Sequence, residues 1–240
     1  MLILLAVTAL LTSLLAALIG FGGGMLLLAV LPFFLPAAAL IPLHGIAQLA
    51  SNSSRALFAP KDVHWSVLPA FLLGSALGVA AGYLLLSRLP LAMLPLLIGG
   101  YMLLNLWHPG FKRLTGRAEN FVILGFLQTG LGLFVGATGP LTMTALLKKT
   151  QDQNQIIATS ALLMTVSHLC KVLLFGALGF IYSDYLWPLL ALCIGAIAGS
   201  WLGSRIRPAG HNARYLLLMK TALTLLALHL LWQGIRPFLA

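Results

Sequence analysis

The chain has 240 residues, of which 60% are hydrophobic and only 8% are charged. About a quarter of the residues of a soluble domain are charged, so this composition excludes an ordinary water-soluble protein and predicts an all-α, polytopic membrane protein. The net charge of +10 comes mostly from basic residues between apolar runs, which is typical of helix ends anchored against anionic lipid and not of a nucleic-acid surface.

Eight hydrophobic segments follow one another along the chain, roughly at 2–34, 38–59, 65–86, 90–107, 119–147, 155–180, 185–204 and 213–234. A straight transmembrane helix needs about 20 residues, so the first and fifth segments are too long for one span. Each holds a glycine-rich motif well inside the run, and we expect a helix that breaks at the motif, where its backbone faces protein or a cavity. The stretch 1–19 has no basic start, so we interpret it as the first span and not as a cleaved signal.

The glycine motif of the first segment recurs in the fifth. Residues 20–24 read Gly-Phe-Gly-Gly-Gly, and residues 136–140, which lie 116 positions later (136 − 20), read Gly-Ala-Thr-Gly-Pro. Glycine permits positive φ and close backbone approach, and the N–H groups exposed where a helix restarts can hold an anion. Tight helix packing is the alternative, since small residues are common in membrane interfaces. The duplication favours an anion site, whose expected ligands here are Gly22, Gly23, Gly24, Thr138 and Gly139.

The second and sixth segments carry polar side chains on one helical face. The spacing is that of an α-helix over His44, Gln48, Ser51, Asn52 and Arg55, and again over Ser160, Ser167, His168 and Lys171. Polar groups in hydrocarbon are costly and normally face the bundle interior. Snorkelling to the interface is an alternative for Arg55, which stands near the end of its segment, but it explains the deeper Lys171 less well.

The two cations indicate an anionic ligand. All four carboxylates of the chain fall at segment ends or in loops: Asp62, Glu119, Asp152 and Asp184. A cation in a low-dielectric site needs a counter-charge, and we expect the substrate to supply it. Arg55 and Lys171 would bind this anion together with Asn52 and His168. Because histidine titrates near neutral pH, His168 and His44 are also the candidates for proton coupling.

A ladder of glycines recurs in the third and seventh segments, at Gly74, Gly78 and Gly82 and at Gly195, Gly199 and Gly203. This spacing predicts close helix packing, either between the two halves of the chain or between the protomers of a homodimer. The duplicated motifs divide the chain into a first transmembrane repeat at 1–107, a basic linker at 108–118 and a second repeat at 119–240.

The sequence lacks the common motifs of enzymes and metal sites. It has no His-Glu-x-x-His, no embedded aspartate pair and no Gly-x-Ser-x-Gly elbow, and its few carboxylates disfavour a divalent-cation site. We therefore expect no enzymatic activity, no metal and no cofactor. An ATPase motif is also absent from the sequence, so transport energy would come from an ion gradient or from the substrate gradient.

Several of these motifs resemble the sulfite exporter TauE/SafE family of small bacterial inner-membrane permeases. The resemblance is carried by residues 20–26, which read Gly-Phe-Gly-Gly-Gly-Met-Leu, by Pro32, Pro36 and the Ser/Asn-rich helix after them, and by Thr159-Ser160 after the second motif. At 137–140 the chain has Ala-Thr-Gly-Pro where a Gly-rich sequence is more usual. The resemblance implies a multi-pass permease for sulfur-containing oxyanions such as sulfite or organosulfonates.

We interpret the chain as a secondary transporter, and more specifically an exporter, of a small sulfur-containing anion that alternates access between its two repeats. The alternative is a membrane scaffold or assembly protein, whose polar helix faces bind a partner helix. A ligand stabilises the protein that binds it, so a scaffold should show no saturable effect of anions on thermal stability.

Overall fold

The computed structural model of the chain describes residues 1–20, 22–86, 93–110, 120–135, 138, 140–206 and 213–239. Every regular element in this part of the chain is helical, which confirms the all-α prediction. The α-helices in chain order are α1 (Leu2–Ile19), α2 (Gly23–Val30), α3 (Ala37–Leu57), α4 (Leu68–Leu86), α5 (Leu94–Trp107), α7 (Phe121–Val135), α8 (Pro140–Lys149), α9 (Gln153–Ala177), α10 (Leu186–Ile206) and α11 (Ala213–Leu239). Short 3₁₀ helices lie at Leu31–Phe33, Pro60–Asp62, Trp65–Val67 and Tyr182–Tyr185.

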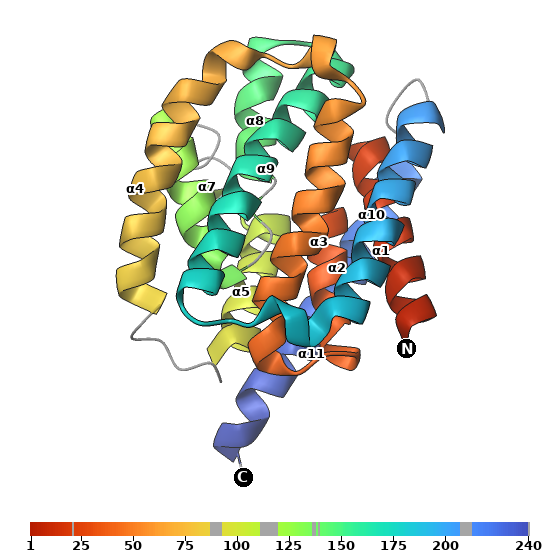
Figure 1. Cartoon of the computed structure of the whole chain (residues 1–240), viewed down its shortest axis with the longest axis vertical. Helices are drawn as coiled ribbons and strands as arrows, with labels where there is room; N and C mark the ends of the chain where they lie inside the picture. The colour runs from red at the N-terminus through yellow and green to blue at the C-terminus, as the bar shows by residue number, and fades with distance from the viewer. Residues whose placement is uncertain are drawn as a thin grey trace.

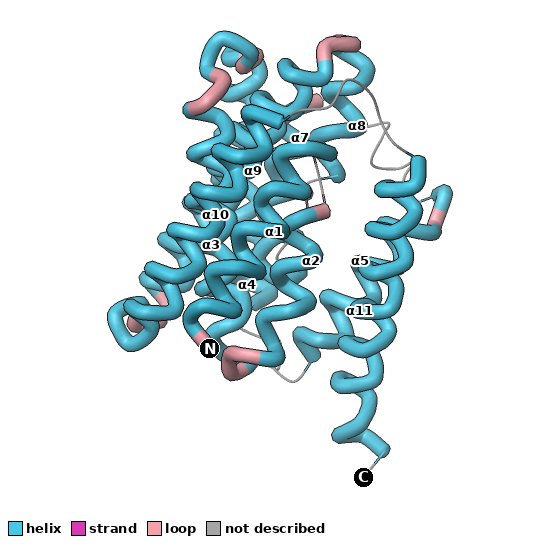
Figure 2. The backbone as a smooth tube through the Cα atoms, turned by 90° about the vertical axis from the view of Figure 1, so that its right-hand side faces the viewer, coloured by secondary structure: helices cyan, strands magenta, loops and turns pink. Residues whose placement is uncertain are grey.

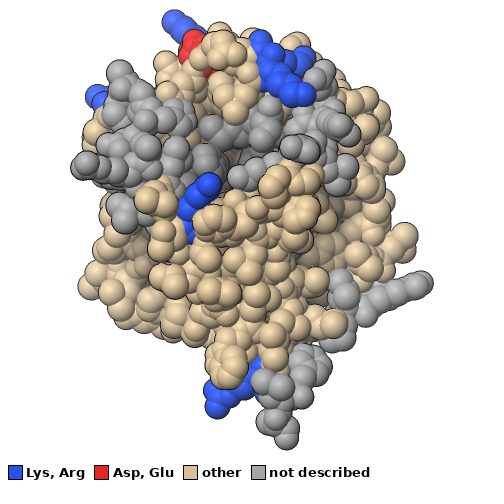
Figure 3. All heavy atoms as spheres, turned by 180° about the vertical axis from the view of Figure 1, so that it is seen from behind, with Lys and Arg blue, Asp and Glu red and all other residues tan. Residues whose placement is uncertain are grey.

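The outer surface of the bundle is suited to lipid. Within the described residues, four helical stretches are long and apolar enough to cross a membrane, namely Leu2–Ile19, Trp65–Leu85, Gln153–Ala177 and Tyr182–Ile206. Large apolar side chains such as Leu73 and Ile194 are exposed on them, and on the face shown in Figure 3 the described surface between mid-height and the basic residues at the bottom carries no charged residue. The chain is thus a multi-pass membrane protein. The number of eight spans stays a prediction.

Both predicted helix breaks are present. The first long segment is interrupted where α1 ends at Ile19 and α2 begins at Gly23, and the two glycines between them, Gly20 and Gly22, have φ angles of 91° and 90°. This left-handed conformation carries a steric cost for other residues. In the second half, α7 ends at Val135 and α8 begins at Pro140, where proline suits the first turn.

The two glycine ladders pack helices of the same chain against each other. Gly195 and Gly199 of α10 lie so close to the backbone of α1 that any side chain would collide with the carbonyl oxygens of Ala6 and Leu10. Gly74 and Gly78 of α4 meet α7 in the same way, at the carbonyls of Val122 and Phe126. Close packing between helices of the two predicted halves is therefore confirmed, while the homodimer stays a prediction.

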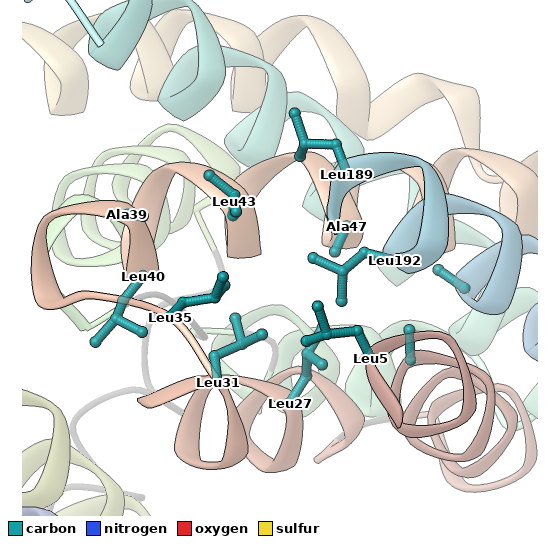
Figure 4. Packing of buried hydrophobic residues seen from close by; sticks show 12 residues of the cluster. Leu5, Leu27, Leu31, Leu35, Ala39, Leu40, Leu43, Ala47, Leu189 and Leu192 are labelled. Carbon is teal, nitrogen blue, oxygen red and sulfur yellow. The ribbon is translucent and has the colours of Figure 1, made fainter. Parts of the chain in front are cut away.

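The pairs α1/α10 and α4/α7 flank the central helices α3 and α9, which lie side by side (Figure 1). Helices α5 and α11 pack together at one side of the bundle, next to α2 (Figure 2). An apolar cluster holds α1, α2, α3 and α10 together through leucines such as Leu5, Leu27, Leu43 and Leu192 (Figure 4). This packing fixes α3 beside the helix break.

The division of the chain into two repeats stays a prediction. Of the linker predicted at 108–118, only residues 108–110 belong to the described part of the chain.

Candidate functional site

A row of buried polar side chains lies where α3 and α9 face each other. Four of them carry or can carry charge: His44 is 0% exposed, Arg55 3%, His168 2% and Lys171 1%. Such groups are rare in the interior of a membrane protein and mark ligand or ion pathways. The burial of Arg55 contradicts the snorkelling alternative, because its side chain stays inside the bundle.

Local signals set the positions of these two helices. Helix α3 begins directly after Pro36, whose φ of −65° and ψ of 151° are extended, and proline is well suited to a helix start. Helix α9 begins after Asp152, which accepts hydrogen bonds from the backbone N–H groups of Asn154 and Gln155 at 2.8 and 3.5 Å. An aspartate at this position satisfies donors that the first turn leaves open.

The polar faces of the two helices meet at a pair of histidines. The rings of His44 and His168 lie edge to face, with their centroids 5.8 Å apart. Nε2 of His44 lies 2.9 Å from the carbonyl oxygen of Gly24 at the start of α2, and Nδ1 of His168 lies 3.4 Å from Nζ of Lys171. The aliphatic stem of Lys171 packs against Gly45, where an added Cβ would lie 3.2 Å from Cδ of the lysine. The cluster thus joins the first helix break to both central helices.

Arg55 ties the other end of the polar row to α1. Its Nη1 donates to the carbonyl oxygen of Ala16 at 3.4 Å, and its Nη2 donates to Oγ of Ser51 at 3.0 Å. The Ala16 carbonyl also accepts from the N–H of Gly20 at the end of α1, where the helix dipole favours a positive charge. His168 is within electrostatic reach of Arg55 as well as of Lys171 and His44.

The other predicted site residues differ in what they contact. The Nδ2 group of Asn52 donates to the backbone oxygen of Gln48 at 2.8 Å. Gly23 packs against the Thr12 carbonyl, which any side chain there would strike, and Gly24 presents its carbonyl to His44. The hydroxyl of Thr138, at the second break, donates to the Gln128 carbonyl at 2.9 Å. Gly22 forms the turn before α2.

Gly139 lies outside the described residues. The structure therefore brings Gly24, His44, His168 and Lys171 into direct contact, with Arg55 in electrostatic reach. It gives Asn52 and Thr138 other hydrogen-bond partners, and it leaves the binding roles predicted for all of these residues as expectations.

A second polar network beside Ser167 was missed by sequence reasoning. Gln128 of α7 donates from Nε2 to Oγ of Ser167 at 3.1 Å, and Thr129 bonds to Oγ of both Ser167 and Ser75 at 3.0 and 2.9 Å. The spacing of the repeat could have found it, because Thr12-Ser13 of α1 precedes Gln128-Thr129 by the same 116 positions (128 − 12) that relate the glycine motifs.

Several polar atoms in this core have no hydrogen-bond partner. Among the described residues, buried side-chain atoms of this kind include Oγ of Ser13, Nδ1 of His44, Oε1 of Gln128 and Nε2 of His168. They belong to four different helices of the core, α1, α3, α7 and α9. Native proteins leave few buried polar groups unsatisfied, so the two unpartnered nitrogens on the neighbouring rings of His44 and His168 indicate a place for a polar ligand.

Neither a metal cluster nor an acidic centre accompanies these atoms in the described part of the chain. No group of three or more His, Cys, Asp or Glu side chains there is placed to hold a metal ion. The described carboxylates stand at turns and helix ends, at Asp62, Asp152 and Asp184. The core chemistry is that of hydroxyls, amides, imidazoles and two cations, which suits the recognition of an anion.

The comparison with known families agrees with this chemistry. The family model described as "Sulfite exporter TauE/SafE" matches residues 5–230. No curated protein and no solved structure shows significant similarity to the chain.

Proposed function

The chain belongs to the sulfite exporter TauE/SafE family, and we propose that it is a secondary transporter that exports a small sulfur-containing anion, sulfite or an organosulfonate, across the bacterial inner membrane. The observation that carries the proposal is the burial of two cations in the interior of a membrane protein, Lys171 in contact with His168 and Arg55 further along α3. Two positive charges at this depth favour an anion, and the unsatisfied imidazole nitrogens offer it hydrogen-bonding groups.

We place the substrate between the central helices, near the first break. Lys171, His168 and Arg55 are its proposed principal contacts. The proposed set is completed by residues at the two breaks and on α3, namely Gly22, Gly23, Gly24, Asn52, Thr138 and Gly139. His168, with His44, is the proposed carrier of any coupled proton, since the described carboxylates lie away from the core.

Alternating access between two repeats is the proposed mode of transport. It is supported by how the broken helices pack: α1 lies against α10, and α7 lies against α4. Each broken helix thus pairs with a helix of the other predicted half. A rocking motion of one half against the other would change the surroundings of α3 and α9 while the site stays between them.

We propose that a groove at one end of the bundle gives access to the site. This open groove of about 730 Å³ begins at Phe58, one turn after Arg55, and is also lined by Lys61, Asp62 and Arg205. Two basic side chains at the mouth would raise the local concentration of a small anion.

The test is a ligand screen on the purified protein. Sulfite, thiosulfate, sulfoacetate and taurine should be compared with sulfate by thermal unfolding at constant ionic strength. A ligand at 100 times its dissociation constant adds about 2.7 kcal/mol of stability, so a true substrate should raise the unfolding temperature in a saturable way. No saturable shift with any of these compounds, together with stable capture of a membrane partner, would favour the scaffold instead.

A further inference from the structure

The two histidines of the core present opposite unmet hydrogen-bonding groups. On His44, Nε2 lies 2.9 Å from the Gly24 carbonyl oxygen. A carbonyl only accepts, so Nε2 carries the hydrogen and donates it. In a neutral imidazole the other nitrogen is then an acceptor. Nδ1 of His44, which is buried and has no hydrogen-bond partner, is therefore an acceptor that lacks a donor.

His168 shows the reverse arrangement. Its Nδ1 lies 3.4 Å from Nζ of Lys171. An ammonium group has donors and no acceptor, so Lys171 donates and Nδ1 accepts. The hydrogen of the neutral ring is then on Nε2, which is also buried without a hydrogen-bond partner. His168 therefore offers a donor that lacks an acceptor.

One small ligand can meet both needs. The ring centroids are 5.8 Å apart, so a molecule of a few heavy atoms reaches both rings. An anion without hydrogen, such as sulfate or a simple sulfonate, can accept from Nε2 of His168 but leaves Nδ1 of His44 without a donor. An unmet buried acceptor costs free energy. An anion with a hydroxyl group satisfies both nitrogens, and its charge suits Lys171.

We propose that the site selects a monoanion that carries its own hydrogen-bond donor, so that the sulfur oxyanion it takes is hydrogensulfite and not sulfite. The anionic oxygen accepts from Nε2 of His168, and the hydroxyl donates to Nδ1 of His44. This inference rests on the proposed function, since it names the form of the anion at the same site.

The test is a pair of matched ligands. Methylphosphonate at mildly acidic pH and methanesulfonate are both monoanions with a methyl group and a tetrahedral head, but only the first carries a hydroxyl. Affinities for the purified wild-type protein should be measured by calorimetry at one pH, so that any titration of the protein acts on both measurements alike. We expect methylphosphonate to bind about tenfold more tightly, the equivalent of one hydrogen bond.

Two variants assign the preference to His44. His44→Phe removes the acceptor and should bring the two affinities together. His229→Phe is the matched control, because His229 lies on α11 with its ring stacked on Phe33 at 5.3 Å, and it should keep the preference. If His44→Phe does not fold, the affinities of the two ligands for the wild-type protein still test the donor requirement.

The outcomes separate this inference from the proposed function. Equal affinities or tighter binding of methanesulfonate would overturn the donor requirement and leave an anion transporter. If sulfite and both probes fail to bind, the proposed function is wrong, and the inference falls with it.

Discussion

Lys171 and Arg55 are both buried cations, but they differ in what else they support. Arg55 holds the end of α1 through the Ala16 carbonyl and also bonds to Ser51, while Lys171 contacts His168. Lys171→Gln should weaken anion binding by about 1–3 kcal/mol, the range for charge-assisted hydrogen bonds. Arg55→Gln should weaken binding similarly and also lower the unfolding temperature without ligand. Calorimetry and thermal unfolding measure the two effects.

Lys149→Gln is the matched control, because Lys149 is exposed near the ring of Phe121. It should change neither binding nor stability beyond the small effect of a surface residue. Normal binding by both Lys171→Gln and Arg55→Gln would rule out the two-cation site.

His168 lies between Lys171 and His44, which makes its protonation sensitive to an anion. Beside Lys171, a second positive charge is unfavourable in the empty site, and a bound anion reduces this repulsion. Binding should therefore take up a proton, so the affinity should rise as the pH falls from about 8 towards 6. Methanesulfonate is the proper ligand for this titration, because its own charge is constant. His168→Gln should flatten the dependence; a flat wild-type profile would leave His168 without a coupling role.

The sequence predicted the burial of polar residues correctly where their helical spacing places them on one face and where exposure of that face to lipid would be costly. Polar side chains such as those from His44 to Arg55 cost free energy when they face lipid, so their burial in the interior of the bundle could be predicted. The contact of Lys171 with His168 follows from their spacing on one helix. The bond from His44 to Gly24 could not be predicted, because it depends on how the broken first helix packs against α3.

At the level of elements, the glycine contacts explain why helices from distant parts of the chain pack so closely. Gly199 of α10 leaves no room for a side chain beside the Leu10 carbonyl of α1. Gly199→Ala should destabilise the protein by about 1–3 kcal/mol through overpacking. Gly100→Ala on α5 is the matched control, since no atom lies within 4 Å of an added Cβ there. The control should be neutral or stabilising, because alanine favours a helix.

Denaturant or thermal unfolding in one detergent compares the two alanine variants. Equal stability of Gly199→Ala and Gly100→Ala would mean that the α1–α10 contact is looser than the glycine ladder indicates.

The helix breaks and the glycine ladders could be predicted from the sequence, but the helices against which the ladders pack could not. Glycines at positive φ and Pro140 at a helix start are local signals, so both breaks could be predicted. The partner of each ladder could not, because glycine spacing says that a helix packs closely but not against which surface. The partners of α4 and α10, which are α7 and α1, required the structure.

At the scale of the whole molecule, the distribution of charge suggests how an anion reaches the core. Most of the described cations are exposed near the ends of the bundle, Lys220 of α11 is half-buried beside the ring of Trp107, and Arg55 and Lys171 are buried. The groove lined by Lys61 and Arg205 lies one turn beyond Arg55. The proposed path from solvent to the site therefore follows the C-terminal end of α3.

This arrangement predicts that the groove controls the rate of transport more than the affinity of the site. The double variant Lys61→Gln with Arg205→Gln removes positive charge at the mouth but leaves Lys171 and His168 in place. Steering by exposed charges is screened by salt, with a Debye length of about 10 Å at 0.1 M. The variant should therefore transport sulfite more slowly than the wild type at low ionic strength, and the two rates should converge as salt is added. Uptake into proteoliposomes over a series of salt concentrations measures this, with calorimetry to show that the affinity is retained.

Lys149→Gln again serves as a control, because it removes an exposed cation outside the groove. If the rate loss of the double variant persists at high salt, the groove acts through local structure and not through its charge; if there is no loss at any salt concentration, the anion enters elsewhere.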